Sequence, residues 1–467
     1  MILTTIGSFM MSLDGSILNI AIPALSQDLE ATFEIVQWIP IIYLLVMATT
    51  LIGFGRIADL KGKKKFFLLG LIIFTVGSLL SAIATTGQIL ILYRAIQAVG
   101  ASLIGATAIA MVTEVFPKQE TGKALGINVA GIYFGLVLGP FLGGLLVQTL
   151  TWRSIFFINL PIGVVLIILS ISILKESEII VKDEKFDLSG TLGFGLFLAV
   201  LLIALSLGNQ LGWSSAILML LIISVILFIA FIYIEKTEKY PMINLSLFRR
   251  NRIFAAANSA ALLNYIATMG VSFLLSIYLQ SILGFSPLIA GLLLLPTPFT
   301  MAITTMLSGR YSDKVGTRYL CAMGMVIMAS AIGLLIYILL YLPIQFILLS
   351  QFILGIGIGF FSAPNQSAIM KSVEKKQLGI ASGTLNTMRT TGQSISIALL
   401  SSVLAIFILP SVLNMILSHQ GGPLPPETPA QFLNGLIAAM IVTIIIIIFG
   451  ALLSLVRGKE ETYKRPD

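Results

Sequence analysis

The segment GRIADLKGKK, residues 55–64, recurs 254 positions later as GRYSDKVGTR, residues 309–318. Both copies lie between long apolar runs, and both place glycines, one acidic residue and basic residues at matching positions. A second match aligns Arg94–Gly135 with Gln351–Gly392 without a gap. Because the two matches follow the same order along the chain, they indicate an internal repeat rather than a chance likeness between apolar segments.

The composition around these copies places most of the chain inside a membrane. Of 467 residues, 57% are hydrophobic and 10% are charged, whereas soluble domains carry about 25% charged residues. The mean hydropathy is +1.04, and it is spread over many long apolar runs. This pattern excludes a soluble globular or secreted protein and predicts an integral membrane protein.

Apolar stretches of roughly 20 residues predict membrane-spanning helices, and this chain contains enough of them for 14 crossings. We expect the first to end near Pro23 and the thirteenth to cover residues 379–408. With both termini cytoplasmic, 25 of the 28 Lys and Arg residues fall in inner loops, as the positive-inside rule requires. The net charge of +8 therefore reflects topology and does not predict binding to nucleic acid.

The repeat and the spans together predict an all-α membrane protein with two six-helix bundles and two extra helices between them, a plan typical of secondary transporters. The expected parts are an N-terminal bundle (1–175), an inserted helix pair with flanking cytoplasmic loops (176–249), a C-terminal bundle (250–410 and 430–457), an outer loop (409–430) and a cytoplasmic tail (458–467).

Asp14 is the only carboxylate predicted in the middle of a span, where an ionised Asp costs roughly 2.5 to 3.5 kcal/mol. Arg94, one of two arginines predicted within helices, is its expected charge partner. Burial disfavours an ionised carboxylate and a nearby cation favours it, so a change of surroundings can switch protonation. The pair therefore favours a proton-coupled carrier. The alternative to proton coupling is that Asp14 only forms a hydrogen bond to a neighbouring helix, or that Asp14 and Arg94 form a buried ion pair that only holds helices together.

Gly131, Gly135, Gly139 and Gly143 lie four residues apart on the expected fifth helix and form one smooth face, with Pro140 as an expected kink. Small-residue faces of this kind allow close helix packing in any membrane bundle.

The repeated loop is expected to act as a gate or latch, because membrane anchoring would explain its lysines but not its duplicated acid. Its residues are Gly55, Asp59, Gly62, Lys63 and Asp313, with Glu114 as a partner or simply a solvated helix end.

The chain has one cysteine, Cys321, and one histidine, His419. An intrachain disulfide, a Cys/His metal site and histidine-based catalysis are therefore not expected. We expect no enzyme activity and no resident cofactor or metal.

The motifs resemble those of the major facilitator superfamily and, within it, the 14-helix drug:proton antiporters of the QacA and EmrB kind. SLDGSILNIAIP (residues 12–23) is similar to the first-helix signature, and residues 55–64 to the loop signature, with Leu60 where a basic residue is usual. Arg94 and Gln97 fit R-x-x-Q-G, although Ala98 replaces the glycine, and WRSIFFINLPIG (residues 152–163) is typical of the 14-helix branch. The antiporter signature G-x8-G-x3-GP-x2-GG is met by Gly126, Gly135, Gly139, Pro140, Gly143 and Gly144.

The resemblance implies alternating access, in which two bundles rock about a central cavity and a compound leaves while protons enter. It also implies that Asp14 and Arg94 respond to protons, that the glycine face seals the bundle interface and that Asp59 latches one state. The proton gradient would drive the cycle. The expected setting is a prokaryotic plasma membrane, where the protein is expected to act as a monomer.

The expected substrates are small amphipathic compounds that are neutral or singly charged. Relatives that export divalent cations carry extra acids in the thirteenth helix, whereas residues 379–408 contain none and include Arg389. A lipid or metabolite exporter on the same scaffold is the alternative. Residues that could line the cavity, or equally face lipid or core, are Tyr43, Gln97, Tyr133, Asn264, Tyr265, Phe361, Asn365 and Arg389.

Overall fold

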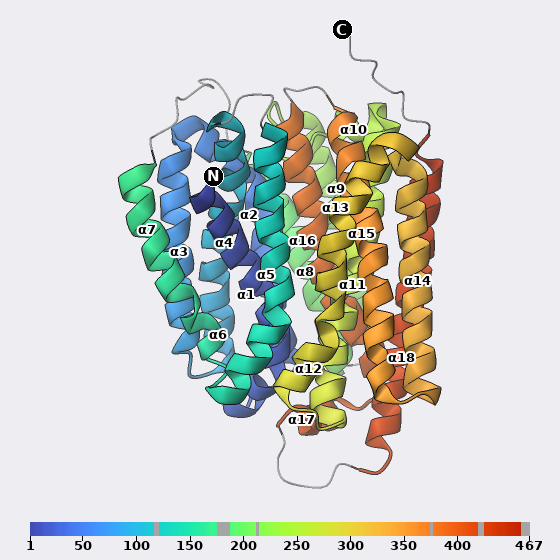
Figure 1. Cartoon of the computed structure of the whole chain (residues 1–467). Helices are drawn as coiled ribbons and strands as arrows, with labels where there is room; N and C mark the ends of the chain where they lie inside the picture. The colour runs from blue at the N-terminus through green and yellow to red at the C-terminus, as the bar shows by residue number, and fades with distance from the viewer. Residues whose placement is uncertain (116–120, 175–186, 212–213, 374–376, 419–424, 459–467) are drawn as a thin grey trace.

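The computed structural model of the chain describes residues 1–115, 121–174, 187–211, 214–373, 377–418 and 425–458. All regular structure within these ranges is helical, and 13 segments are long and apolar enough to cross a membrane. Helices suit such sequences because every backbone polar group finds its partner within the segment, away from lipid. The long helices run side by side along one direction, as Figure 1 shows.

The N-terminal helices form one group in which α1 packs on α5, and α4 packs on both α2 and α3. The short helix α6 and the following α7 together make one candidate span. The bounds are α1 Ile2–Asp28, α2 Phe33–Lys61, α3 Lys63–Ala82, α4 Gly87–Val115, α5 Thr121–Thr149, α6 Ser154–Phe157 and α7 Asn159–Ile173.

The remaining helices comprise a central pair, α8 and α9, and a second group in which α11 packs on α16 and α15 on α13 and α14. One π-helical turn, η1, extends α11, and one 3-10 turn, η2, precedes α15. The bounds are α8 Leu188–Leu211, α9 Ser215–Thr237, α10 Leu245–Arg250, α11 Arg252–Ile277, η1 Tyr278–Ile282, α12 Pro287–Leu294, α13 Pro296–Val315, α14 Thr317–Tyr341, η2 Ile344–Phe346, α15 Ile347–Lys371, α16 Leu378–Ala405, α17 Pro410–Ser418 and α18 Thr428–Val456.

The sequence repeat reappears in the packing of the two groups. A β-carbon on Gly100 of α4 would lie 2.7 Å from the carbonyl oxygen of Gly70 in α3. The corresponding β-carbon on Gly357 of α15 would lie 2.8 Å from the carbonyl oxygen of Gly324 in α14. The matching turn glycines, Gly62 and Gly316, have φ of 107° and 86°, where a side chain would be strained. The two groups therefore share helix contacts as well as motifs.

The predicted thirteenth crossing corresponds to α16, a helix of 28 residues that is not among the 13 apolar segments. Its polar composition has a structural reason. No residue of α16 from 380 to 405 is exposed, because α2, α8, α11 and α18 pack around it. A helix shielded from lipid on all sides can carry polar side chains that a lipid-facing helix cannot.

The prediction that the first helix ends near Pro23 is wrong, because α1 continues to Asp28. A proline within a helix removes one amide hydrogen, which leaves the carbonyl four residues earlier without its helical donor. That carbonyl belongs to Asn19, and it accepts a hydrogen bond of 2.8 Å from Oγ of Ser276 in α11. The proline is thus accommodated by a contact between the two groups of helices.

Candidate functional site

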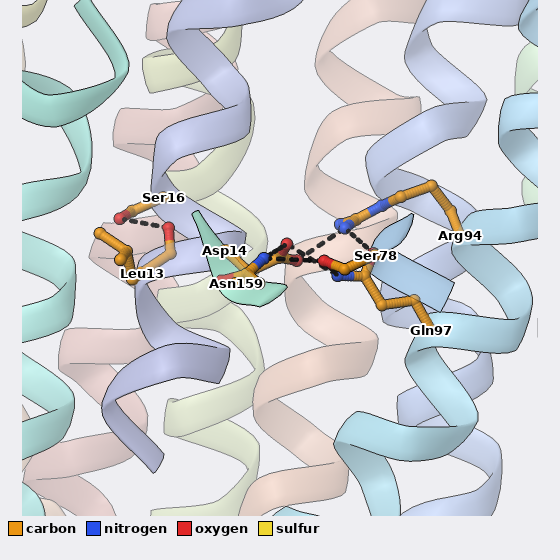
Figure 2. Close-up of polar contacts among 7 residues, drawn as sticks. All are labelled: Leu13, Asp14, Ser16, Ser78, Arg94, Gln97 and Asn159. Atoms are coloured by element: carbon orange, nitrogen blue, oxygen red, sulfur yellow. Dashed lines mark hydrogen bonds and ion pairs between the residues drawn. The ribbon is translucent and has the colours of Figure 1, made fainter. Parts of the chain in front are cut away.

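Asp14 and Arg94 form a direct ion pair in the interior of the N-terminal group. Nη1 of Arg94 lies 2.6 Å from Oδ2 of Asp14, and each side chain is only 1% exposed. Asp14 comes from the middle of α1 and Arg94 from the N-terminal part of α4 (Figure 2). The sequence indicated that the two charges balance each other, and the structure adds that they touch.

Two amide side chains complete the hydrogen bonding of the Asp14 carboxylate. Nε2 of Gln97 and Nδ2 of Asn159 both donate to Oδ1, at 2.9 and 3.0 Å. Gln97 also accepts from Nη1 of Arg94 at 2.6 Å through its Oε1. Both amide groups donate to Oγ of Ser78 at 2.9 Å, which links α3 to the same cluster. Figure 2 shows these side chains converging between α1, α3, α4 and α7.

The guanidinium of Arg94 is also held by aromatic rings. Its Cζ lies 4.2 Å from the ring centre of Tyr43 in α2 and 5.6 Å from that of Phe156 in α6. A cation over an aromatic face is stabilised, most strongly when it is removed from water. Tyr43 and Gln97, both predicted for the substrate cavity, therefore lie against the ion pair in this conformation.

Asp14 accepts hydrogen bonds from three side chains, and one of them is the Arg94 cation. A proton bound to Asp14 would remove the charge that holds Arg94 and would turn one acceptor oxygen into a donor. The contacts of Arg94, Gln97, Asn159 and Ser78 within the cluster therefore depend on this one carboxylate.

The glycine face of α5 packs along the helix that carries Asp14. A β-carbon on Gly135 would lie 2.6 Å from the carbonyl oxygen of Phe9, and one on Gly143 would lie 2.9 Å from that of Ile17. At Gly139 a β-carbon would overlap Oγ of Ser16. Since α1 and α5 touch along this face, its glycines set the distance between them. Gly126 belongs to the part of α5 for which the structure describes the backbone but not the packing contacts.

Gly144 and Pro140 face the other group of helices. A β-carbon on Gly144 would lie 2.7 Å from Cα of Leu288 in α12, and one on Gly291 would overlap the carbonyl oxygen of Pro140. Nearby, Nε2 of Gln280 donates to the carbonyl oxygen of Ile20 at 3.1 Å. The two groups therefore meet at this end of the molecule, where α12 lies beside α5 in Figure 1.

The other residues predicted for the cavity belong to α5, α11, α15 and α16. Tyr133, Tyr265 and Arg389 are half-buried, whereas Asn264, Phe361 and Asn365 are buried. Nδ2 of Asn264 donates to Sδ of Met328 and that of Asn365 to the carbonyl oxygen of Ala257. The three half-buried side chains retain access to open space, while the three buried ones are held in helix contacts.

The residues predicted for the latch lie at the ends of helices. Gly55 of α2 faces Ala106, and its repeat copy Gly309 faces Ala363, with β-carbon distances of 3.7 and 3.6 Å. Gly62 forms the turn before Lys63, which begins α3. The side chains of Asp59, Glu114 and Asp313 lie outside the described residues, so their predicted roles stay predictions.

Asn159 and Ser78 are part of the cluster although sequence reasoning did not select them. Asn159 is the only amide residue in the apolar run from Ser154 to Ser170, which is a signal that could have identified it. Ser78 gives no such signal, since serine is common in membrane helices. No group of three or more potential metal ligands occurs among the described residues.

A profile of the Major Facilitator Superfamily matches residues 4–185 and 188–397. The riboflavin transporter RibZ of Clostridioides difficile (strain 630) is 34% identical over 405 residues, which are 87% of this chain and 88% of RibZ. The multidrug resistance protein Stp of Mycobacterium tuberculosis (strain ATCC 25618 / H37Rv) is 32% identical, with 87% and 76% covered. Multidrug resistance protein 3 of Bacillus subtilis (strain 168) is 30% identical, with 85% and 78% covered.

Among solved structures, a bacterial homologue of the human lysosomal transporter Spinster, inward-facing and occupied, matches with a TM-score of 0.72 at 15% identity. The match covers 98% of this chain and 95% of that one. The peptide transporter POT in complex with sulfate matches with a TM-score of 0.65 at 15% identity, covering 97% and 95%. At these identities the likeness concerns the fold alone.

Proposed function

The chain belongs to the Major Facilitator Superfamily, and we propose that it is a proton-coupled antiporter that exports amphipathic compounds, neutral or singly charged, by alternating access. As a multi-pass membrane transporter it is not an enzyme, in keeping with its family and relatives. The observation that carries the proposal is the buried contact between Asp14 and Arg94, with a 2.6 Å separation. Three relatives named for multidrug resistance or multidrug transport support the substrate class.

The coupling step follows from the hydrogen bonds of Asp14. In this conformation the carboxylate is 1% exposed, so proton exchange requires a second conformation in which it meets water. A proton taken up there displaces Arg94, and α1 then shifts against the smooth face of α5. Release of the same proton on the other side restores the ion pair, while the exported compound moves the opposite way. Each charge that crosses about 100 mV contributes roughly 2.3 kcal/mol.

The proposal includes the finer architecture predicted from sequence. In it the chain belongs to the 14-helix branch, α16 is a crossing, both termini are cytoplasmic, and the bundles are residues 1–175 and 250–410 with 430–457, joined by 176–249. Asp59, Glu114 and Asp313 act with the glycines of their loops as the latch. The protein works as a monomer in a bacterial plasma membrane without a resident cofactor, and the bacterial origin of the relatives supports this location.

A metabolite exporter on the same scaffold is the second candidate. It is favoured by RibZ, which is named a riboflavin transporter and is 34% identical to this chain. The two candidates differ in the compound that is carried and share the proton step at Asp14.

Everted membrane vesicles with a preset, inside-acid pH gradient test both candidates. Addition of an amphipathic drug should dissipate the gradient in vesicles that contain the protein and leave it intact in vesicles with Asp14→Asn. Dissipation by riboflavin alone would favour the metabolite exporter. A gradient that responds to neither compound, in vesicles with correctly folded protein, would contradict proton-coupled export of either class.

A further inference from the structure

Three charged residues lie more than six residues from both ends of a described helix: Asp14, Arg94 and Arg389. The first two neutralise each other at 2.6 Å. Arg389, near the middle of α16, forms no hydrogen bond or ion pair with any residue that the structure describes. Among the middle parts of the helices that the structure describes, one positive charge, that of Arg389, is therefore left without an ion-pair partner.

Arg389 does not compensate its charge by reaching lipid headgroups. The residues of α16 from 380 to 405 are all buried or half-buried, since other helices surround it. Arg389 itself is half-buried, and its nitrogen atoms are not among the buried polar atoms that lack a partner. The guanidinium thus borders accessible space inside the protein.

That space lies where the two groups of helices face each other. One turn beyond Arg389, a β-carbon on Gly392 would lie 2.8 Å from Cβ of Tyr265 in α11. Arg389 is also within electrostatic range of Tyr265 and of Tyr133, which belongs to α5 in the N-terminal group. Both tyrosines are half-buried like Arg389. Arg389 and the two tyrosines therefore belong to three helices drawn from both groups, and α16 itself packs on α2 of the N-terminal group and on α11 of the second group.

An unpaired arginine within a membrane protein is costly and marks a substrate or ion pathway. Its planar guanidinium binds carboxylates and similar oxyanions through two parallel hydrogen bonds. We propose that Arg389 is the anion-binding residue of the substrate site, and that the transporter prefers amphipathic monoanions, an apolar or aromatic body with one acidic group, over cations. This inference rests on the proposed export function and names its substrate class.

The test is a binding measurement on the purified full-length protein in detergent, at fixed pH and ionic strength. The probes are naphthylacetate, naphthylacetamide and naphthylmethyl-trimethylammonium, which share one ring system and differ in charge. A ligand that binds the folded state raises its thermal midpoint, and the stabilisation grows with the logarithm of the ligand concentration divided by Kd. The variants are Arg389→Gln, which removes the charge, and Arg389→Lys, which keeps the charge without the planar fork.

We expect the wild-type protein to bind naphthylacetate roughly tenfold or more tightly than the trimethylammonium compound, since one charge contact of this kind is worth about that factor. Arg389→Gln should reduce this ratio to about threefold or less, and Arg389→Lys should keep an intermediate ratio. A cooperative thermal transition of Arg389→Gln without ligand, near that of the wild type, shows that the variant is folded, and the neutral amide gives the reference affinity within each variant.

Tighter binding of the cation, or an anion preference that survives in Arg389→Gln, would overturn the assignment. Failure of naphthylacetate to bind at any soluble concentration would also contradict it. These outcomes leave the proton step untouched, because that step is judged in vesicles by the effect of Asp14→Asn. If the three probes bound equally well and a drug still dissipated the pH gradient in vesicles, the protein would be an exporter without the anion site.

Discussion

Asn159 of α7 donates a hydrogen bond of 3.0 Å from Nδ2 to Oδ1 of Asp14 in α1, across 145 positions of sequence. The contact places a neutral amide beside Asp14, the one carboxylate near the middle of a helix that the structure describes. Asn159 also donates to Ser78 in α3, and Arg94 and Gln97 of α4 bond to the same carboxylate. A change in the charge of Asp14 would therefore alter contacts of α3, α4 and α7 together.

Replacement of Asn159 by alanine should lower the rate of export driven by a pH gradient, because Asp14 then loses one of the three side chains that donate to it. The contact of Asn159 with Ser78 in α3 is lost as well. Stability should fall by about 1 to 3 kcal/mol, the cost of a lost buried hydrogen bond. The rate of pH-driven export in proteoliposomes and the thermal midpoint of the purified variant check the prediction.

Ser170→Ala is the matched control, because Ser170 is a fully buried residue of the same helix whose Oγ bonds to no residue that the structure describes. Its rate of pH-driven export should match that of the wild type. An equal loss of export in both variants would mean that the rate reports the packing of α7 rather than the bond to Asp14.

Gly139→Ala should slow transport, because the new β-carbon would overlap Oγ of Ser16 on α1. Overpacking of this kind costs about 1 to 3 kcal/mol and hinders movement of α1 against α5. The double variant Ser16→Gly with Gly139→Ala should recover part of the turnover, since the clashing atoms are gone. Turnover is measured as substrate efflux at saturating pH gradient.

Gly15→Ala serves as the comparison for that series. Gly15 is adjacent to Asp14, yet no described atom of another helix lies within 4 Å of a β-carbon at this position. We expect near-normal turnover from it. If Gly15→Ala were as slow as Gly139→Ala, helix propensity rather than the close approach of α1 and α5 would explain both results.

Gly291→Ala should separate α12 from α5, since its β-carbon would overlap the carbonyl oxygen of Pro140. A cysteine introduced at the buried Ser276, which bonds to Asn19 across the same end, reports the opening. Labelling of Ser276→Cys by a membrane-impermeant maleimide, added on the side of the membrane where α12 lies, should rise when Gly291→Ala is added. The native Cys321 is buried, and an unchanged labelling rate would show that this contact does not hold that end closed.

Much of the architecture followed from sequence because it rests on local signals. Turn residues divide the long uncharged runs of the sequence, and the helices end and begin there: α3 and α4 meet around ATTGQ (residues 84–88), and α14 and α15 around YLPIQ (residues 341–345). The predicted end of the first helix near Pro23 was wrong, because the carbonyl that the proline leaves without its helical donor has another donor. Here the donor is Ser276, more than 250 residues away in α11.

The sequence predicted the charged residues of the candidate site but not all of its neutral residues. Asp14 and Arg94 stand out because charge in an apolar helix is rare and costly. Ser78 and Asn159 join them through the packing of α3 and α7, which one sequence does not reveal. Gln97 and Tyr43 were assigned to the cavity, yet both contact the ion pair; the direction in which a helix residue faces depends on its neighbours.

The most direct test of proton coupling at Asp14 compares two assays on Asp14→Asn in proteoliposomes. Asparagine keeps the shape and an acceptor oxygen at this position but cannot bind and release a proton near neutral pH. Export driven by a pH gradient should be lost, while exchange of labelled for unlabelled substrate at equal pH should continue. Export by Asp14→Asn at the wild-type rate under the same gradient would contradict the account.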